Sequence, residues 1–317
     1  MSLKGFNNIY DQTLNNELQD NLIEYFDWHL LDKANYFNIE LNEQSYSGSD
    51  YSLLQITNNS TFEGGEAWDG FRKNWVWQSG VNPSGFAPPL VGTDDDYPGI
   101  EGVYVDDTFY PADVTGPYAH NVDYFNGRVI FDNPIPLNSK VQAEFSYKYI
   151  NVVYATSVPW LREFYFNTLD PSNRESVSIP PEMQIQLPAI AVEIVPQRTM
   201  KPYELGALGQ FVETDVLFHC IAEDDMTRNK LVDIVSMQND SIIPMFDTNK
   251  MAEARAFPIN SYGYPVAGAL RYPDLVSNFP GNSFLLKDVN VQVIDMINSN
   301  LHAGVVRFTT EYITSTF

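Results

Sequence analysis

Residues 210–238 read QFVETDVLFHCIAEDDMTRNKLVDIVSMQ, a strand pattern followed directly by a helix pattern. The apolar and β-branched side chains from Gln210 to Ala222 predict a strand. Carboxylates at 223–225 complement the exposed amides and the positive end of a helix dipole, so we expect a helix from there to about Gln238. One side of this helix carries the apolar residues Leu231, Ile234, Val235 and Met237.

Further strand patterns flank this unit. Residues 183–195 form a strand pattern interrupted by Pro188, which places that strand at a sheet edge. Two more candidates, 285–296 and 305–313, follow near the C-terminus. The order strand–strand–helix–strand–strand predicts that residues 159–317 form an α+β domain, with a mostly antiparallel sheet and one packed helix.

The N-terminal half divides into a helical segment and a β-rich domain. In residues 1–45 the apolar positions recur at three- and four-residue spacing, which predicts an amphipathic helix docked on protein. These positions are Leu14, Leu18, Leu22, Tyr25, Phe26 and Leu30. From residue 46 to 158, short runs of β-formers alternate with Gly, Pro, Asn and Asp, and they predict a sandwich-like β domain with long aromatic loops.

Local signals specify parts of the β domain. Asn126-Gly127, inside the alternating run 122–131, predicts a hairpin with a two-residue type I′ turn. Residues 102–110 predict a smaller hairpin that turns on Asp106-Asp107. The alternation in 141–153 is typical of one half-buried strand.

The composition excludes several classes of function. The chain has 41 acidic and 18 basic residues, which give a net charge of −23. This charge argues against a protein that binds the phosphates of nucleic acid or anionic lipid. The one cysteine, Cys220, excludes a disulfide within the chain and a cysteine-based zinc site, and we expect it to be an inert buried thiol. The N-terminal residues lack the apolar run of a secretory signal, so we expect synthesis in the cytoplasm.

Catalytic and cofactor motifs are absent from the sequence. It contains no GxxxxGK[ST] loop, GxGxxG, GxSxG or HExxH, and its four histidines have no metal-ligand spacing. We therefore expect a protein that is not an enzyme and has neither cofactor nor metal. The acidic residues Asp94, Asp95, Asp96, Asp106 and Asp107 could supply calcium ligands, but their spacing favours solvated turns.

Aromatic residues are abundant, at 14% of the chain, and Trp68, Trp75 and Trp77 lie close together in sequence. Exposed rings would offer a platform for a glycan or a protein partner, since they combine large contact area with a polar group. Burial of the same rings would instead supply the core of the β domain. The sequence leaves both interpretations open.

The C-terminal half resembles the tail-terminator and neck proteins of tailed bacteriophages. The resemblance rests on the strand 187–193, LPAIAVE, the Leu-Gly pair at 205–206, and the strand ending at Ala222 that runs into the acidic start of a helix. It covers residues 183–240, and the run 123–132 also resembles β segments of phage virion proteins. A minimal terminator has no counterpart of residues 46–158, and we expect this region to reach a neighbouring virion component.

The resemblance implies a homo-oligomeric ring, commonly sixfold, that caps the tail tube and joins the tail to the head. It implies a virion location, contacts with other neck, tail-tube or sheath proteins, no membrane, and DNA only as a passing cargo that does not adhere. The candidate interface residues are Trp68, Trp75, Trp77, Leu187, Ile190, Leu205 and Leu208. The acidic residues expected to face the DNA passage, where like charge prevents adhesion, are Asp94, Asp95, Asp96, Asp106, Asp107, Asp224 and Asp225.

Two alternatives stay open beside this interpretation. The first is a carbohydrate-binding or receptor-binding β module that uses Trp68, Trp75 and Trp77 as its platform. The second is a metal-dependent hydrolase built on the region 94–107, which we expect less because no base, nucleophile and ligand set converge there.

Overall fold

A computed structural model describes residues 8–11, 14–41, 44–45, 49–78, 100–112, 115–155, 186–203, 209–258, 270–298 and 301–314. The chain forms two compact units. Unit 1 comprises residues 1–28, 150–255 and 272–317, and unit 2 comprises 29–149 and 256–271. The fold is α+β with strands dominant, as predicted. The units differ from the expected division at 45 and 158, because most of the N-terminal helix belongs with the C-terminal sheet.

Unit 1 is built on one long mixed sheet. Its helices are α1 (Asn15–Asp32, most of which belongs to this unit), α3 (Asp225–Ser236), α4 (Thr248–Glu253) and α5 (Tyr272–Asn278). Its strands are β12 (Asn151–Tyr154), β13 (Ala189–Pro202), β14 (Gln210–Ala222), β15 (Ile242–Phe246), β16 (Pro280–Asn298) and β17 (Leu301–Thr314). The order across the sheet is β12-β13-β14-β17-β16-β15. Only the β12–β13 pair is parallel, so the prediction of a mostly antiparallel sheet is confirmed.

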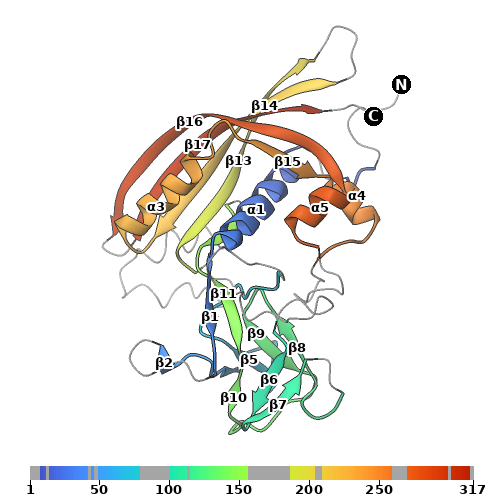
Figure 1. The fold of residues 1–317 in the computed structure, drawn as a ribbon, viewed down its shortest axis with the longest axis vertical. Coiled ribbons are helices and arrows are strands. Elements are labelled where there is room, and N and C mark those ends of the chain that lie inside the picture. The colour runs from blue at the N-terminus through green and yellow to red at the C-terminus, as the bar shows by residue number, and fades with distance from the viewer. Residues whose placement is uncertain are drawn as a thin grey trace. The chain divides into compact units, whose positions relative to one another are not determined.

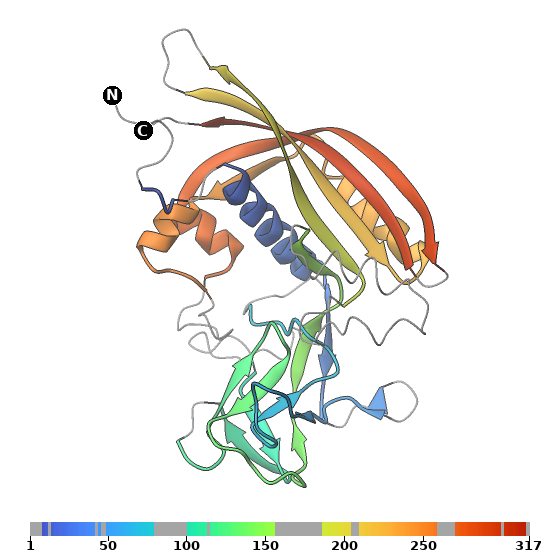
Figure 2. The same ribbon diagram turned by 180° about the vertical axis from the view of Figure 1, so that it is seen from behind.

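The helices α1 and α3 lie on the same face of this sheet. Residues opposite each other on paired strands point to one face, and Phe218 of β14 lies opposite Val306 of β17. Phe26 of α1 contacts Phe218, with ring centroids 5.1 Å apart. Gly304, two residues from Val306, faces α3. Figure 1 shows both helices in front of the strands, and Figure 2 shows the strands in front of α3.

Helix α1 is anchored to the sheet by buried amide side chains. Asn21 makes reciprocal bonds with the backbone of Phe246: its Nδ2 donates to the carbonyl at 3.0 Å, and its Oδ1 accepts from the N–H at 2.8 Å. Gln19 donates to the carbonyl of Val192 at 2.7 Å. Because these buried polar groups are satisfied only in the docked position, they fix where the helix lies. The predicted apolar stripe is buried at Leu18, Leu22, Phe26 and Leu30.

Helix α3 begins where the acidic signal predicted. Asp224 is its N-cap, and its carboxylate accepts from the N–H of Thr227 at 2.8 Å. Leu231 and Val235 are buried as expected. The prediction for Met237 was wrong, because its side chain is 78% exposed. The helix ends at Ser236, and Met237 follows Val235 by two residues, which turns its side chain away from the buried face.

Unit 2 consists of short antiparallel strands around an aromatic core. The strands are β1 (Tyr36–Ile39), β2 (Gln44–Ser45), β3 (Ser49–Asp50), β4 (Gln55–Thr57), β5 (Ala67–Asp69), β6 (Gly102–Val105), β7 (Thr108–Pro111), β8 (His120–Asp123), β9 (Arg128–Phe131), β10 (Val141–Gln142) and β11 (Phe145–Lys148). They form the sheets β1-β11, β10-β6-β7, β2-β3 and β4-β5-β9-β8. Trp75 stacks on Phe145 at 4.2 Å in the core.

The hairpin signals in unit 2 had mixed outcomes. The hairpin on Asp106-Asp107 is confirmed, and both residues have positive φ, 49° and 65°. The two-residue turn predicted for Asn126-Gly127 is wrong, because Asp123 pairs with Arg128 and leaves a four-residue loop. In that loop only Gly127 has positive φ, since Asn126 instead bonds to the Asp123 carboxylate through its N–H and Nδ2. The single strand predicted over 141–153 is divided into β10, β11 and β12.

Gly304 permits the close approach of α3 to the sheet. A Cβ on Gly304 would lie 2.7 Å from Cγ2 of Val232 and 3.3 Å from Cδ of Arg228. We expect Gly304→Ala to lower the free energy of unfolding of unit 1 by about 1–3 kcal/mol, the usual effect of overpacking. Urea unfolding with a tryptophan-independent probe such as circular dichroism measures the loss.

Val232→Ala supplies the matched control, because it removes the methyl group that the new Cβ would meet. Alone it creates a small cavity and destabilises, but combined with Gly304→Ala it restores part of the lost stability, so the two effects are not additive. Strictly additive losses would show that Gly304 does not set the distance between α3 and β17.

Candidate interaction surfaces

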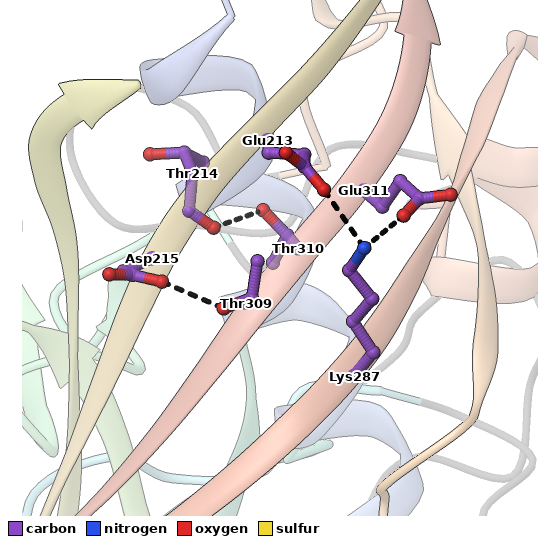
Figure 3. A network of polar contacts seen from close by, with 7 residues as sticks. All are labelled: Glu213, Thr214, Asp215, Lys287, Thr309, Thr310 and Glu311. Carbon is purple, nitrogen blue, oxygen red and sulfur yellow. Dashed lines mark hydrogen bonds and ion pairs between the residues drawn. The ribbon is translucent and has the colours of Figure 1, made fainter. Parts of the chain in front are cut away.

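The face of the unit 1 sheet opposite α1 and α3 carries a network of ion pairs across three strands. Glu213 of β14 lies opposite Glu311 of β17, and Lys287 of β16 reaches both carboxylates (Figure 3). The Lys287 Nζ donates to Oε1 of Glu213 at 2.9 Å and also to Glu311. The hydrogen bonds to these two carboxylates raise the pKa of Lys287, and the bond from Lys287 lowers the pKa of Glu213. The cluster therefore joins β14, β17 and β16 on this face.

Two more polar groups continue along the same face. Asp215 accepts from the Thr309 hydroxyl at 2.9 Å and pairs with Arg307 (Figure 3 shows the Asp215–Thr309 contact). Farther along, the His219 Nε2 lies 2.7 Å from Oε2 of Glu193. The His219 side chain is 22% exposed on this face. We call the surface formed by Glu193, Glu213, Asp215, His219, Lys287, Arg307, Thr309 and Glu311 the polar face.

Among the residues that the structure describes, parts of both long edges of the sheet have no neighbouring strand. β12 covers β13 as far as Val192, and on the other edge β16 bonds to β15 and the residues before it as far as Leu286, which exchanges backbone hydrogen bonds with Asp240 and Ser241. The Val289 N–H also donates to the Asn239 side chain, so the uncovered part of β16 begins after Val289. On the β16 edge, Val291 and Val293 are 44% and 49% exposed.

The two edges differ in chemistry. The β13 edge contains Pro196, Pro202 and Lys201, all exposed, which are residues that limit pairing with further strands. The β16 edge after Asp288 has no proline and alternates apolar with amide side chains, in the run VNVQV at 289–293. An exposed apolar edge of this kind is a template for strand addition. The β16 edge is therefore the stronger candidate for pairing with another chain.

The three tryptophans proposed as an interface do not form a platform. Trp68, Trp75 and Trp77 are 4%, 1% and 5% exposed and belong to the core of unit 2. The indole N–H of Trp68 and that of Trp75 donate to the backbone carbonyls of Gly65 and Arg72. Of the two interpretations left open by the sequence, the core interpretation is confirmed. The rings pack there with leucine, isoleucine and valine side chains of the same core.

The structure describes two of the four candidate interface residues of unit 1. Ile190 is fully buried on the face that α1 covers. Leu187 is half-buried and packs on a small apolar cluster that contains Ala191 and Ile221. Leu205 and Leu208 lie outside the described residues. A direct contact with a partner is therefore ruled out for the Ile190 side chain in this fold.

Among the acidic candidates that the structure describes, Asp106, Asp107 and Asp224 have local structural roles. Asp106 accepts from the N–H of Lys140 at 2.8 Å, and Asp107 pairs with the Lys140 ammonium at 3.1 Å. Asp224 caps α3, and hydrogen bonds from Thr227 lower its pKa. Asp225 is exposed in the first turn of α3. Asp94, Asp95 and Asp96 lie outside the described residues. That the acidic candidates face a passage for DNA therefore stays a prediction.

Within the described ranges, no group of three or more His, Cys, Asp and Glu is arranged to hold a metal ion. Cys220 is buried, and burial raises the pKa of its thiol to about 12, so it is protonated at neutral pH as predicted. Among the described helices, none is long and apolar enough to cross a membrane.

Sequence reasoning missed the polar face. Its members lie 24 to 94 positions apart in pairs such as Lys287–Glu311 and Asp215–Thr309, and only the strand register brings them together. A weak signal was present, because Glu213, Asp215 and His219 stand at every-second positions of a strand pattern, although Thr214 and Leu217 break strict alternation. That spacing places the three side chains on one face of a strand but does not identify their partners.

A carboxylate cluster lies where the start of α1 meets α4. Burial and the neighbouring Asp247 carboxylate raise the pKa of Glu17 to about 7, although a hydrogen bond from the Thr248 backbone opposes this shift. Asp247 is the N-cap of α4 and accepts from the N–H groups of Asn249 and Lys250. Protonation of Glu17 therefore favours the docked position of α1.

The sign of the resulting pH dependence is set by the raised pKa. Folded Glu17 keeps its proton up to about pH 7, whereas an unfolded glutamate loses it near pH 4.5. The contribution of protonated Glu17 to the free energy of unfolding is therefore complete below pH 4.5 and is lost as the pH rises through 7. We expect the melting temperature of unit 1 to fall between pH 5 and pH 8, and Glu17→Gln to flatten this fall. Calorimetry at three pH values measures it.

Glu253→Gln, at an exposed position of α4, is the matched control and is expected to keep the wild-type pH profile. An unchanged slope in Glu17→Gln would mean that Glu17 is ionised in the folded protein at pH 5.

Comparisons with known proteins returned no match: no family description, no curated relative and no solved structure is similar to this chain.

Proposed function

We propose that this chain is a structural subunit of a tailed-phage virion, which assembles with its own copies into a ring at the neck or tail terminus. The observation that supports this best is the pair of open edges on the unit 1 sheet. A ring needs a heterologous interface, in which two different surfaces of one subunit meet those of its neighbours. Among the described residues, the β13 edge beyond Val192 and the β16 edge beyond Val289 are two different surfaces on opposite sides of one sheet.

The exposed side chains of the two edges are also complementary in chemistry. The β16 edge presents exposed Val291 and Val293. The β13 edge presents Met200, which is 43% exposed, together with the cations Arg198 and Lys201. Apolar contact at the centre and polar side chains at the rim is the usual composition of a protein interface. This complementarity supports contact through side chains between the edge of one copy and the opposite edge of the next, because Pro196 and Pro202 limit a continuous strand ladder on the β13 edge.

The charge balance is compatible with a passage for DNA. With a net charge of −23, the chain repels phosphate at long range. On the polar face, Lys287 and Arg307 are each paired with carboxylates, which limits their availability to phosphates. A surface of this kind lets DNA pass without adhering. Within the virion, we propose that unit 2 contacts a neighbouring neck, tail-tube or sheath protein.

Ring assembly is tested on the β16 edge. We expect the purified chain to form a closed oligomer in light scattering and native mass spectrometry. The double variant Val291→Lys with Val293→Lys should shift it towards monomer, because charge and lost apolar area both weaken the contact. Met226→Lys, on a 78% exposed methionine of α3, is the matched control and should leave the oligomer intact.

Some rings form only on their neighbours in the particle, so cryo-microscopy of the parent virion completes the test. A chain that is monomeric at every concentration and salt, and that occupies no ring in the particle, would overturn the proposal.

A further inference from the structure

The side of α3 that points away from the sheet carries four exposed residues in one line. A helix turns through about 100° per residue, so positions 226, 230, 233 and 237 follow one another along the side opposite the buried residues of α3. The outer two are methionines, each 78% exposed, and the inner two are an exposed lysine and an exposed aspartate. We call Met226, Lys230, Asp233 and Met237 the α3 stripe.

The α3 stripe is held on a rigid element. Asp224 caps the helix by accepting from the N–H of Thr227 at 2.8 Å, and the opposite side of the helix is buried against the sheet. Met237, the C-cap, still has helical backbone angles, with φ of −65° and ψ of −11°. A partner would therefore meet side chains whose backbone is already ordered, which lowers the entropy cost of binding.

The charged pair of the stripe has no counter-ion within the described part of the chain. Among the described residues, neither the Lys230 ammonium nor the Asp233 carboxylate forms an ion pair. In this they differ from Lys287 and Arg307 on the polar face, which are both paired with carboxylates. Both charges of the stripe are thus accessible to a group outside the chain.

The stripe is complementary to itself. Its outer pair, Met226 and Met237, and its inner pair, Lys230 and Asp233, are both centred on the point between positions 231 and 232. A second copy of α3, laid antiparallel about a twofold axis at that point, sets Met226 against Met237 of the second copy. It sets Lys230 against Asp233 of the second copy in the same way. A contact of this kind, repeated on both sides of the axis, is an isologous interface.

Charge selects the antiparallel arrangement. A parallel pair of α3 helices would set lysine against lysine and aspartate against aspartate, and opposed like charges disfavour a contact. Antiparallel alignment gives two Lys–Asp contacts and places the positive end of each helix dipole beside the negative end of the other. Methionine side chains are flexible and adapt to one another, which suits the two ends of such a contact. The surface therefore fits a second copy of this chain.

We propose that two copies of this chain associate through their α3 stripes, antiparallel and about a twofold axis. The contact uses neither edge of the unit 1 sheet, so it goes beyond the proposed ring and does not depend on it. Between two rings it would join them and leave each ring closed. A 12-residue helix is about 18 Å long. A contact of this length is small, and we expect a dissociation constant on the order of 10–100 μM.

Sedimentation of the full-length chain over about 1–500 μM measures this contact. The net charge of −23 opposes association, so the salt concentration is about 0.15 M, which screens charges more than about 8 Å apart. We expect the mass to double over this range, from one chain to two or from one ring to two. Met226→Lys should prevent the doubling without opening a ring.

Charge exchange tests the arrangement. Lys230→Glu and Asp233→Lys each set like charges opposite one another, and each should weaken the association about tenfold or more. The double variant Lys230→Glu with Asp233→Lys restores opposite charges in both contacts and should return to within about threefold of the wild-type affinity. Glu253→Lys, at an exposed position of α4, changes the net charge as Asp233→Lys does and should leave the doubling unchanged.

Circular dichroism of each variant checks that it is folded. The proposal is overturned by a mass that does not double up to the highest concentration, by a double variant no better than the single ones, or by equal weakening from Glu253→Lys. The number of copies in the smaller species reports ring assembly, and the doubling reports the α3 contact. Failure of either proposal therefore leaves the other standing.

Discussion

The pairing of β14 with β17 is the interaction on which the rest of unit 1 depends. It extends over all 13 residues of β14 and sorts the side chains of both strands onto two faces. On one face Val216, Phe218, Val306 and Phe308 form an apolar layer, which α1 and α3 cover. The opposite face receives the charged and hydroxyl side chains. A shift of one residue in this register would exchange the two sets and leave both helices without an apolar surface.

This division of faces explains why the helices are held by few polar contacts. Burial of the apolar layer supplies most of the stabilisation, and it has little directionality. Asn21 and Gln19 add the directionality, because their amides find partners at one position of α1 only. The pKa of Glu17, raised to about 7, is the electrostatic consequence of packing the acidic start of α1 beside Asp247.

The polar face and the open edges have different consequences for assembly. Charges on the polar face are largely satisfied within the chain, so partners would gain little from them. The backbone groups along an uncovered edge can be satisfied by solvent or by another strand, and the proposed ring assembly rests on these edges. Unit 2 has short strands around an aromatic core.

The sequence by itself determined the elements with strong local signals. The periodic apolar residues of α1, the acidic cap of α3 and the hairpin at Asp106-Asp107 were all predictable, because each depends on residues a few positions apart. The α+β class followed from the order of these elements. The prediction of a two-residue turn at Asn126-Gly127 was wrong, because hydrogen bonds from Asn126 to Asp123 compete with the local preference of this pair for a type I′ turn.

Only the tertiary structure decided which aromatic residues are exposed and which charges meet. Three tryptophans close together in sequence are equally compatible with a binding platform and with a core. Whether Trp68, Trp75 and Trp77 are buried depends on strands that are distant in sequence. Lys287 meets Glu213 and Glu311 through register across three strands, and Phe37 meets Tyr147 in the same way. Such contacts depend on how strands far apart in the chain align, and a pattern of neighbouring residues carries no information about that alignment.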